Sequence, residues 1–202
     1  MGVLEESAKR AFDFFFSLVG FVFLAPLFLV VGAAIKLDAR GPVFYRSERI
    51  GRYGKPFRMW KFRTMYLNSE CLGVTTGEND PRVTRVGKFL RKYKIDELPQ
   101  LINVLTGEMS LVGPRPEVHE HTSAYTGEEE LILTVRPGIT DYASVQFRNQ
   151  DQWVGSEDPH RTFIEKIRPE KNRLRIAYVK RQSFFEDLKI LFQTLLCVIG
   201  RR

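Results

Sequence analysis

The chain of 202 residues is long enough for one domain with a hydrophobic core, and it carries a formal charge of +7 with a pI near 9.5. This charge favours an anionic partner: nucleic acid, acidic lipid or a phosphorylated small molecule. The two cysteines, Cys71 and Cys197, form no CxxC pair, and His119 and His121 have the wrong spacing for two metal ligands on a helix. The sequence therefore argues against a disulfide scaffold or a zinc site, and it fits a reducing compartment.

An uncharged segment covers residues 14–35, and 15 of its 22 residues are Phe, Leu, Val or Ile. As a helix it would be about 33 Å long, which is enough to cross the hydrocarbon core of a bilayer. At about −0.3 to −0.6 kcal/mol each, those residues favour insertion by about 4 to 9 kcal/mol before the Gly, Ser and Pro terms are subtracted. A signal peptide and a buried core helix are weaker interpretations, because the segment is too long and has no polar face.

Pro26, preceded by Ala25, lies near the middle of this segment, where it removes a backbone hydrogen bond and should break the helix. Basic residues flank both ends, so the positive-inside rule keeps both ends in the cytoplasm. They are Lys9 and Arg10 before the segment, and Lys36, Arg40, Arg46, Arg49 and Arg52 after it. We therefore expect a Pro-broken re-entrant helix within a membrane unit at residues 1–35, although a simple crossing also fits. In either case, residues 36–202 form a cytoplasmic, membrane-associated domain.

Two short strands are expected at residues 43–45 and 57–62, joined by a turn rich in Gly and Pro. Arginine and lysine are frequent in this β-hairpin, which indicates either a surface for phosphates or lipid headgroups or a solvated basic hairpin. After a polar loop at 67–81, residues 83–94 combine apolar residues at helical spacing with several Arg and Lys residues. This pattern predicts a basic amphipathic helix that suits an anionic membrane surface.

Asp96 and Glu97 follow this helix directly and precede Pro99 and an apolar pattern of helical spacing at residues 98–105. Because proline is tolerated in the first turn, the two carboxylates fall at or next to a helix N-terminus, where the helix dipole favours negative charge. An acidic helix cap would explain the pair in isolation. The nearby basic residues would hold both carboxylates ionised and would also attract an anionic substrate.

Three arginines follow in loops. Arg115 has a proline on each side, so a rigid loop presents its guanidinium, as suits bidentate phosphate binding. Arg136, in a second Arg-Pro-Gly turn, and Arg148 would not stand out as isolated residues. Finally, residues 183–200 begin with a capping box and carry one apolar face. This amphipathic helix either lies at the membrane interface or packs on the core.

In the order of its motifs, the chain resembles the monotopic phosphoglycosyl transferases, bacterial sugar transferases that begin polysaccharide or glycoprotein assembly on undecaprenyl phosphate. The membrane segment is followed by GPVFYRSERIG, GKPFRMWKFRTM, FLRKYKIDELPQLINVLTGEMSLVGPRPE and RPGIT. The resemblance spans most of the chain, as a catalytic unit alone, and DELPQ with GPRP after KFRTM is its most specific part. We therefore expect an α+β, mostly helical fold. A re-entrant helix, a small β-hairpin and interfacial amphipathic helices would surround a cytoplasmic active site.

The resemblance implies a reaction in two steps. A UDP-sugar gives its phosphosugar to an enzyme carboxylate and releases UMP, and undecaprenyl phosphate then takes the phosphosugar to form a lipid diphosphate sugar. By motif match, Asp96 would be the nucleophile and a ligand of Mg²⁺, and Glu97 would assist in metal binding or proton handling. The arginines and lysine that match the family's motifs would contact phosphate or nucleotide; these are Lys61, Arg91, Arg115, Arg136 and Arg148.

The implied partners are a UDP-sugar, undecaprenyl phosphate and membrane lipid, with Mg²⁺ as cofactor and no nucleic acid. Downstream glycosyltransferases are further candidates. The implied location is the bacterial inner membrane, with the catalytic domain on its cytoplasmic face.

Two departures from the family pattern are evident. Ala25 replaces the Ser that many relatives carry before the proline, and the stretch after RPGIT begins DYAS at residues 141–144. We expect this stretch to help select the sugar, and its resemblance to a similar stretch in some relatives favours an N-acetylhexosamine. The competing hypothesis is a non-catalytic, basic, membrane-anchored protein that binds anionic lipid or nucleic acid. That hypothesis gives no reason for two adjacent carboxylates amid basic residues.

Overall fold

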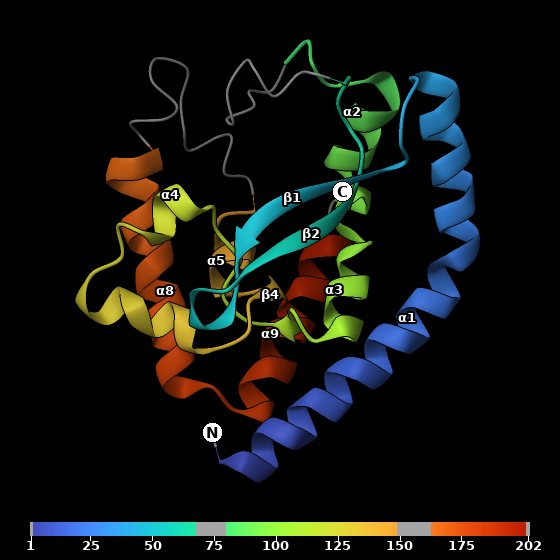
Figure 1. Cartoon of the computed structure of the whole chain (residues 1–202). Helices are drawn as coiled ribbons and strands as arrows, with labels where there is room; N and C mark the ends of the chain where they lie inside the picture. The colour runs from blue at the N-terminus through green and yellow to red at the C-terminus, as the bar shows by residue number, and fades with distance from the viewer. Residues whose placement is uncertain (1, 68–79, 149–162, 201–202) are drawn as a thin grey trace.

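A computed structural model describes residues 2–67, 80–148 and 163–200, and its elements confirm the expected α+β, mostly helical class (Figure 1). The helices are α1 (Val3–Asp38), α2 (Arg85–Lys92), α3 (Gln100–Thr106), α4 (His119–Thr122), α5 (Tyr142–Gln146), α8 (Arg168–Arg181) and α9 (Phe184–Ile199). The strands are β1 (Phe44–Ile50), β2 (Pro56–Phe62), β3 (Ser110–Val112) and β4 (Gly138–Thr140). Short turns of helix occur at Arg52–Gly54, Ile95–Glu97, Gly127–Thr134 and Phe163–Ile167. Cys71 and most of the predicted loop at 67–81 lie outside the described residues.

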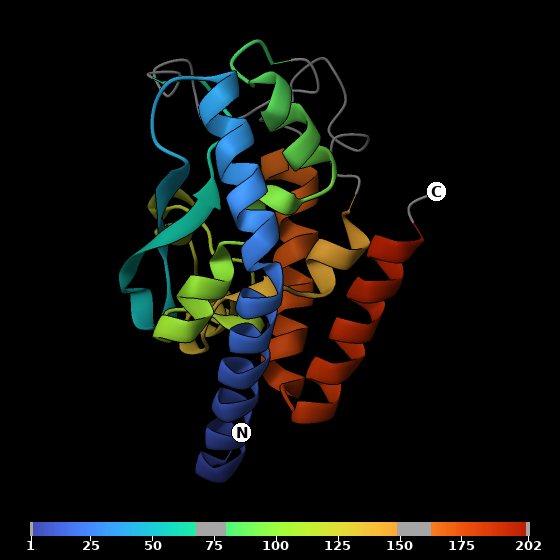
Figure 2. The same cartoon turned by 90° about the vertical axis from the view of Figure 1, so that its right-hand side faces the viewer.

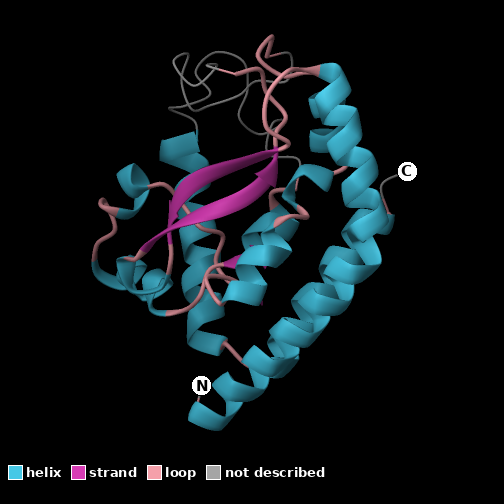
Figure 3. Cartoon of the chain, turned by 45° about the vertical axis from the view of Figure 1, so that its right-hand side comes forward, coloured by secondary structure: helices cyan, strands magenta, loops and turns pink. Residues whose placement is uncertain are grey.

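Helix α1 runs without interruption from Val3 to Asp38 and contains Pro26 in its interior. It changes direction along its length, so the break predicted at Ala25 and Pro26 is instead a bend within one continuous helix (Figure 3). A proline removes a single backbone hydrogen bond, which can kink a helix whose other bonds remain. The helix is long and apolar enough to cross a membrane, and only 11% of its most apolar window is buried. Most of this window is therefore not covered by the described residues of the chain.

Polar side chains on one face dock the N-terminal part of α1 onto the rest of the chain. Lys9 forms a buried ion pair with Asp187 of α9, and its Nζ donates to the carbonyl oxygen of Val112 (3.1 Å). Asp13 accepts a hydrogen bond from the hydroxyl of Ser110 (2.7 Å). The residues expected to be merely basic flanks of a membrane segment thus include a buried cation with a specific partner.

The C-terminal part of α1 is held by apolar packing and by helix capping. Its core residues pack with one residue each from β2 and α2; the cluster is Val31, Ile35, Phe62 and Leu90. The carboxylate of Asp38 accepts from the backbone N–H of Val86 (2.9 Å) in the first turn of α2. Arg63, directly after β2, is buried and donates to the carbonyl oxygens of residues 39 and 40 (2.6 and 2.5 Å). Both ends of α1 therefore contact the same body of the protein.

The predicted β-hairpin is present, with a longer first strand than expected. Strands β1 and β2 pair in antiparallel register from Phe44 opposite Phe62 to Ile50 opposite Pro56. On the second side of the hairpin, Phe57 and Met59 pack with Val104 of α3 and with Met109. A second, parallel pair of strands, β3 and β4, was not predicted.

Helix α9 begins where the capping box predicted, because the hydroxyl of Ser183 accepts from the backbone N–H of Glu186 (3.2 Å). It packs on the core through Ile190 and Asp187, whereas other apolar side chains, such as Phe192 (62% exposed), remain exposed. The helix thus packs on the core, which was one of the two predicted alternatives. It also has an exposed apolar side, as the other alternative, a helix at the membrane interface, requires. Figure 2 shows α9 on the opposite side of α1 from the hairpin.

Candidate active site

Asp96 and Glu97 lie in a short turn of helix, Ile95–Glu97, between α2 and α3. Lys94 adopts a left-handed conformation (φ 57°) and reverses the chain after α2, while Pro99 directly precedes α3. This arrangement confirms that the two carboxylates lie beside a helix start. It also buries Asp96, whose residue surface is only 8% exposed.

Glu97 is held between two cations that come from distant parts of the sequence. Its Oε1 accepts from Nζ of Lys61 on β2 (3.2 Å) and from the guanidinium of Arg115. Burial alone would raise the pKa of Glu97, but the charges of Arg115 and Lys61 outweigh it and lower this pKa well below its usual range. Glu97 is therefore ionised, and its charge is engaged by its two neighbours.

Asp96 has a different environment from its neighbour. Its Oδ1 is buried and has no hydrogen-bond partner among the residues that the structure describes. Burial, followed by the charge of Glu97, raises the pKa of Asp96, and the charges of Lys61, Lys94 and Arg91 oppose this rise. Adjacent carboxylates whose environments push their pKa values apart commonly take different chemical roles. Here one oxygen of Asp96 is left to attack an electrophile or to bind a cation.

The donor set around Asp96 fits a hard divalent cation only if a substrate supplies further oxygens. No group of three or more His, Cys, Asp or Glu side chains that could hold a metal occurs within residues 2–67, 80–148 and 163–200. Mg²⁺ commonly binds through one or two carboxylates together with substrate phosphates and water. The partnerless oxygen of Asp96 suits that mode, because a buried carboxylate oxygen without a donor otherwise leaves its hydrogen-bonding capacity unused.

Arg91 is placed close to the acidic pair by tight packing of α2. A Cβ atom on Gly87 would lie 2.1 Å from the carbonyl oxygen of Thr64, so only glycine allows this approach of α2 to the end of β2. Across this contact, Nε of Arg91 donates to the hydroxyl of Thr64 (2.9 Å). Its charge still acts on Asp96, where it lowers the pKa.

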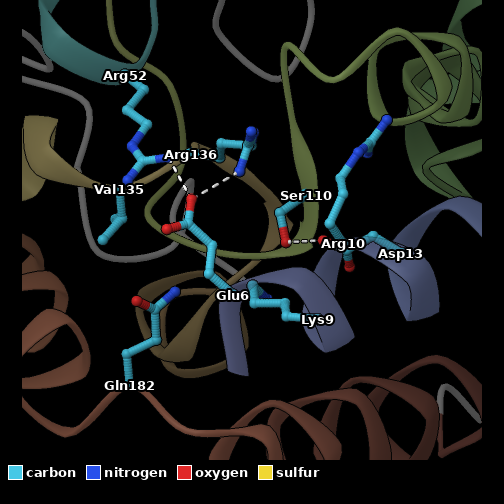
Figure 4. A pocket seen from close by; sticks show the side chains of 9 residues that line it. All are labelled: Glu6, Lys9, Arg10, Asp13, Arg52, Ser110, Val135, Arg136 and Gln182. Atoms are coloured by element: carbon cyan, nitrogen blue, oxygen red, sulfur yellow. Dashed lines mark hydrogen bonds and ion pairs between the residues drawn. The ribbon is translucent and has the colours of Figure 1, made fainter. Parts of the chain in front are cut away.

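The structure places the other two predicted arginines elsewhere. Arg136 donates through Nη1 to Glu6 of α1 (3.2 Å) and through Nε to the carbonyl of Gly107 (3.1 Å). Figure 4 shows Glu6 between Arg136 and Arg52, beside a cavity of about 150 Å³ that also borders the polar face of α1. Arg148 donates to the carbonyl of Cys197 in α9 (2.8 Å). Lys61 and Arg115 thus contact the acidic pair, whereas Arg136 and Arg148 bind other elements.

A second charged cluster supports the Arg115 loop and was missed by the sequence analysis. The carboxylate of Asp141 accepts from the backbone N–H of Arg115 (3.1 Å), and Arg175 of α8 donates to Asp141 (3.4 Å) and to Glu117 (2.8 Å). Burial would raise the pKa of Glu117, but hydrogen bonds and charges from His121 and Arg175 lower it to about 2. Arg175 lies in a helix of mixed charge, so no local pattern could have identified it.

Known proteins resemble this chain along almost its whole length. A family model described as "Bacterial sugar transferase" matches residues 4–201. The chain is 39% identical over 191 residues to the UDP-glucose:undecaprenyl-phosphate glucose-1-phosphate transferase of Escherichia coli, covering 93% of this chain and 39% of that protein. It is 36% identical over 195 residues to the UDP-N-acetylgalactosamine-undecaprenyl-phosphate N-acetylgalactosaminephosphotransferase of Aeromonas hydrophila, covering 95% and 43%.

A smaller relative is matched along most of its length. The exopolysaccharide production protein ExoY of Sinorhizobium fredii is 35% identical over 206 residues, with 93% of this chain and 84% of that protein covered. The chain thus spans about two fifths of the length of the two larger relatives and most of the smaller one.

Proposed function

The chain belongs to the bacterial sugar transferase family, and on that premise we propose that it transfers a sugar 1-phosphate from a UDP-sugar to undecaprenyl phosphate. The products are UMP and an undecaprenyl-diphosphate sugar, the first membrane-bound intermediate of a polysaccharide or glycoconjugate. The names of the relatives from Escherichia coli and Aeromonas hydrophila support this substrate pair. The observation that carries the proposal is the difference between the two carboxylates, because Glu97 is engaged by two cations while Asp96 keeps a buried oxygen without a partner.

In the proposed first step, an oxygen of Asp96 attacks the phosphorus that carries the sugar. A bond forms between that oxygen and phosphorus, the bond from phosphorus to the bridging oxygen breaks, and the bridging oxygen leaves with UMP. In the second step, a phosphate oxygen of undecaprenyl phosphate attacks the same phosphorus and releases the Asp96 carboxylate. A carboxylate nucleophile thereby divides one transfer between two large anions into two separate displacements.

Charge is the main obstacle to this chemistry, since an anionic nucleophile must approach an anionic diphosphate. Glu97 holds Lys61 and Arg115 by ion pairs beside Asp96, and in this proposal both cations also contact substrate phosphate. Arg91 adds a third positive charge. Fixed cations in a site that excludes water stabilise charge that develops in the transition state. In this assignment Glu97 orients the cations, and Asp96 performs the displacement.

We also propose that Mg²⁺ takes part, with Asp96 as its protein ligand. The partnerless carboxylate oxygen of Asp96 fits this role. The ion would neutralise charge on the diphosphate when bound. Because Mg²⁺ and the substrate would bind together, we expect the unaltered protein to bind more Mn²⁺ than Asp96→Asn at the same UDP concentration, measured by electron paramagnetic resonance against a protein-free sample that contains the same Mn²⁺ and UDP.

We propose that the protein lies in the bacterial inner membrane with a re-entrant α1, and the contacts of α1 support the re-entrant topology. At its N-terminal end, Lys9 pairs with Asp187, and Arg10 donates to the carbonyls of Val104 and Leu105 (2.5 and 2.9 Å). At its C-terminal end, Asp38 caps α2. Because both ends bind one domain, they would lie on the same side of the membrane, which in this proposal is the cytoplasmic side. A tag at the N-terminus should be inaccessible from the periplasm of intact cells; periplasmic labelling would show a true crossing.

For the sugar of the UDP-sugar substrate, we propose a chemical class, an N-acetylhexosamine, and no individual sugar. Relatives of similar identity are named for glucose and for N-acetylgalactosamine, so identity does not separate a hexose from an N-acetylhexosamine. The DYAS stretch favours an N-acetylhexosamine. Its first residue, Asp141, contacts the backbone of Arg115, so this stretch is linked to the acidic pair.

One experiment tests the reaction and identifies the sugar. The purified protein is incubated with undecaprenyl phosphate, Mg²⁺ and each member of a panel of UDP-hexoses and UDP-N-acetylhexosamines, and UMP release is measured. We expect release with one sugar class. Failure with every sugar would favour the competing hypothesis of a basic membrane protein that binds anionic lipid without turnover.

A further inference from the structure

Helix α8 contains a buried arginine that no motif predicted. The side chain of Arg175 is 2% exposed, yet both of its carboxylate partners lie in other segments, 34 and 58 residues away. Its guanidinium donates to Asp141 (3.4 Å), to Glu117 (2.8 Å) and to Asn172 of its own helix (3.2 Å). A buried charge is tolerated when partners satisfy it, as these three do.

The carboxylates of Asp141 and Glu117 both adjoin the Arg115 loop. Glu117 follows that loop directly, and Asp141 accepts from the backbone N–H of Arg115 (3.1 Å) through the same oxygen, Oδ2, that receives Arg175. The second oxygen of Asp141 caps α5 by accepting from the N–H of Ser144 (2.6 Å). Arg175 therefore holds Asp141 and Glu117, the residue that follows the loop, at the same time.

We infer that Arg175 is a positioning residue for the transfer reaction: it holds Asp141 and Glu117 so that the Arg115 loop, which contacts Asp141 and precedes Glu117, directs the guanidinium of Arg115 at Glu97. This inference rests on the proposed function. A series of contacts links α8 to the acidic pair: Arg175 binds Asp141, Asp141 binds the backbone of Arg115, and Arg115 forms an ion pair with Glu97. Arg175 itself touches neither Asp96 nor Glu97 in any hydrogen bond or ion pair of the described residues.

The geometry explains why arginine occupies this position. Its planar fork reaches Asp141 through Nε and Glu117 through Nη1, two different nitrogens with a fixed separation. A lysine keeps the charge but has one nitrogen, so it cannot hold both carboxylates in the same way. A small displacement of a group that positions substrate can lower the rate of an enzyme by about 100-fold.

The test uses Arg175→Lys in the full chain, with Arg173→Gln as its matched control. Arg173 lies on the same helix, but its side chain is 70% exposed and pairs only with Glu170 of α8 among the described residues. UMP release is measured for each variant in two backgrounds, with Arg115 intact and with Arg115→Ala, under single-turnover conditions. Backbone hydrogen exchange of the peptide that contains residues 113–117 is measured in parallel and needs no turnover.

With Arg115 intact, we expect Arg175→Lys to lower the single-turnover rate at saturating UDP-sugar about 10- to 100-fold, with a smaller change in the UDP-sugar concentration that gives half of this rate. In the Arg115→Ala background the same substitution should lower the rate less than about 3-fold, because residues that act as a unit are not additive. Exchange in the 113–117 peptide should be faster in Arg175→Lys and unchanged in Arg173→Gln. If Arg175→Lys fails to fold, Asp141→Asn replaces it, because its amide has one acceptor oxygen and cannot accept from the N–H groups of both Arg115 and Ser144 as the carboxylate does.

The opposite results overturn the inference. Equal losses in the two backgrounds, or unchanged exchange in residues 113–117, would make Arg175 a purely structural residue. If the unaltered protein releases no UMP from any UDP-sugar, the proposed function fails and the inference fails with it. If the unaltered protein turns over and the losses are equal, only the role of Arg175 is wrong.

Discussion

The buried ion pair between Lys9 and Asp187 should be a main determinant of how α1 docks. The side chains are 10% and 4% exposed, so Lys9→Met leaves a nearly buried carboxylate whose remaining side-chain partner is the hydroxyl of Tyr178 (2.7 Å). Breaking a buried ion pair by removing one partner typically costs about 3–5 kcal/mol. The carbonyl of Val112 also loses its donor Lys9. The hydroxyls of Tyr178 and Ser110 lie within hydrogen-bond distance of this carbonyl, but each has a single hydrogen, and the shorter contacts of these hydroxyls are with Asp187 and Asp13.

Protonation sets an upper limit to this loss. A carboxyl group with an unfolded pKa of about 3.9 costs about 4 kcal/mol to protonate at pH 7, at 1.36 kcal/mol per unit. We therefore expect a loss of about 3 to 4 kcal/mol, and for a chain of this size that lowers Tm by about 6 to 16 °C. Burial already raises the pKa of Asp187, and removing Lys9 raises it further. The folded state then binds more protons than the unfolded state, so the loss should shrink as pH falls, to about 1.5 kcal/mol at pH 5.

The assay is thermal unfolding of the protein in lipid nanodiscs at pH 7 and pH 5. Asp187→Asn added to Lys9→Met should recover most of the lost Tm at pH 7, because no buried charge remains. Lys88→Met, at an exposed position of α2, is the control and should change Tm by less than about 2 °C. An unchanged Tm in Lys9→Met, or a double variant as unstable as the single one, would refute the role of this pair.

Further predictions concern the acidic pair and the packing of α2. The charge of Glu97 raises the pKa of Asp96. Glu97→Gln should therefore move the acid limb of the pH profile of kcat/KM to lower pH, measured on the activity that this variant retains. A shift to higher pH would contradict this prediction. Gly87→Ala should destabilise the protein by about 1–3 kcal/mol, since the new Cβ would lie 2.1 Å from the carbonyl oxygen of Thr64. Gly20→Ala is the control in the same thermal unfolding assay, because its new Cβ would lie 3.6 Å from its nearest neighbour. Equal losses of Tm in Gly87→Ala and Gly20→Ala would contradict this prediction.

Local patterns predicted the elements that depend on neighbouring residues. The apolar run of α1, the Gly- and Pro-rich turn between β1 and β2 and the proline after Asp96 and Glu97 each act within a few residues of chain. These patterns also placed the two carboxylates beside a helix start. The continuity of α1 through Pro26 was missed, because a proline pattern alone does not distinguish a bend from a break.

Long-range pairing explains most of what the sequence could not reveal. Arg136 binds Glu6, 130 residues away, and Arg175 binds Glu117, 58 residues away. Similarly, the apolar pattern of α9 did not show that Asp187 faces the core, since its partner Lys9 is 178 residues away. In each case the side chain alone looks like an ordinary surface charge, and only the fold supplies its partner.

The most direct test of the proposed mechanism is mass spectrometry of the protein after reaction with its UDP-sugar in the absence of undecaprenyl phosphate. We predict that the peptide containing Asp96 gains the mass of one sugar phosphate, that undecaprenyl phosphate removes this adduct, and that Asp96→Asn carries none and does not turn over. UMP release without any adduct, together with turnover by Asp96→Asn, would contradict the assignment of Asp96 as the nucleophile.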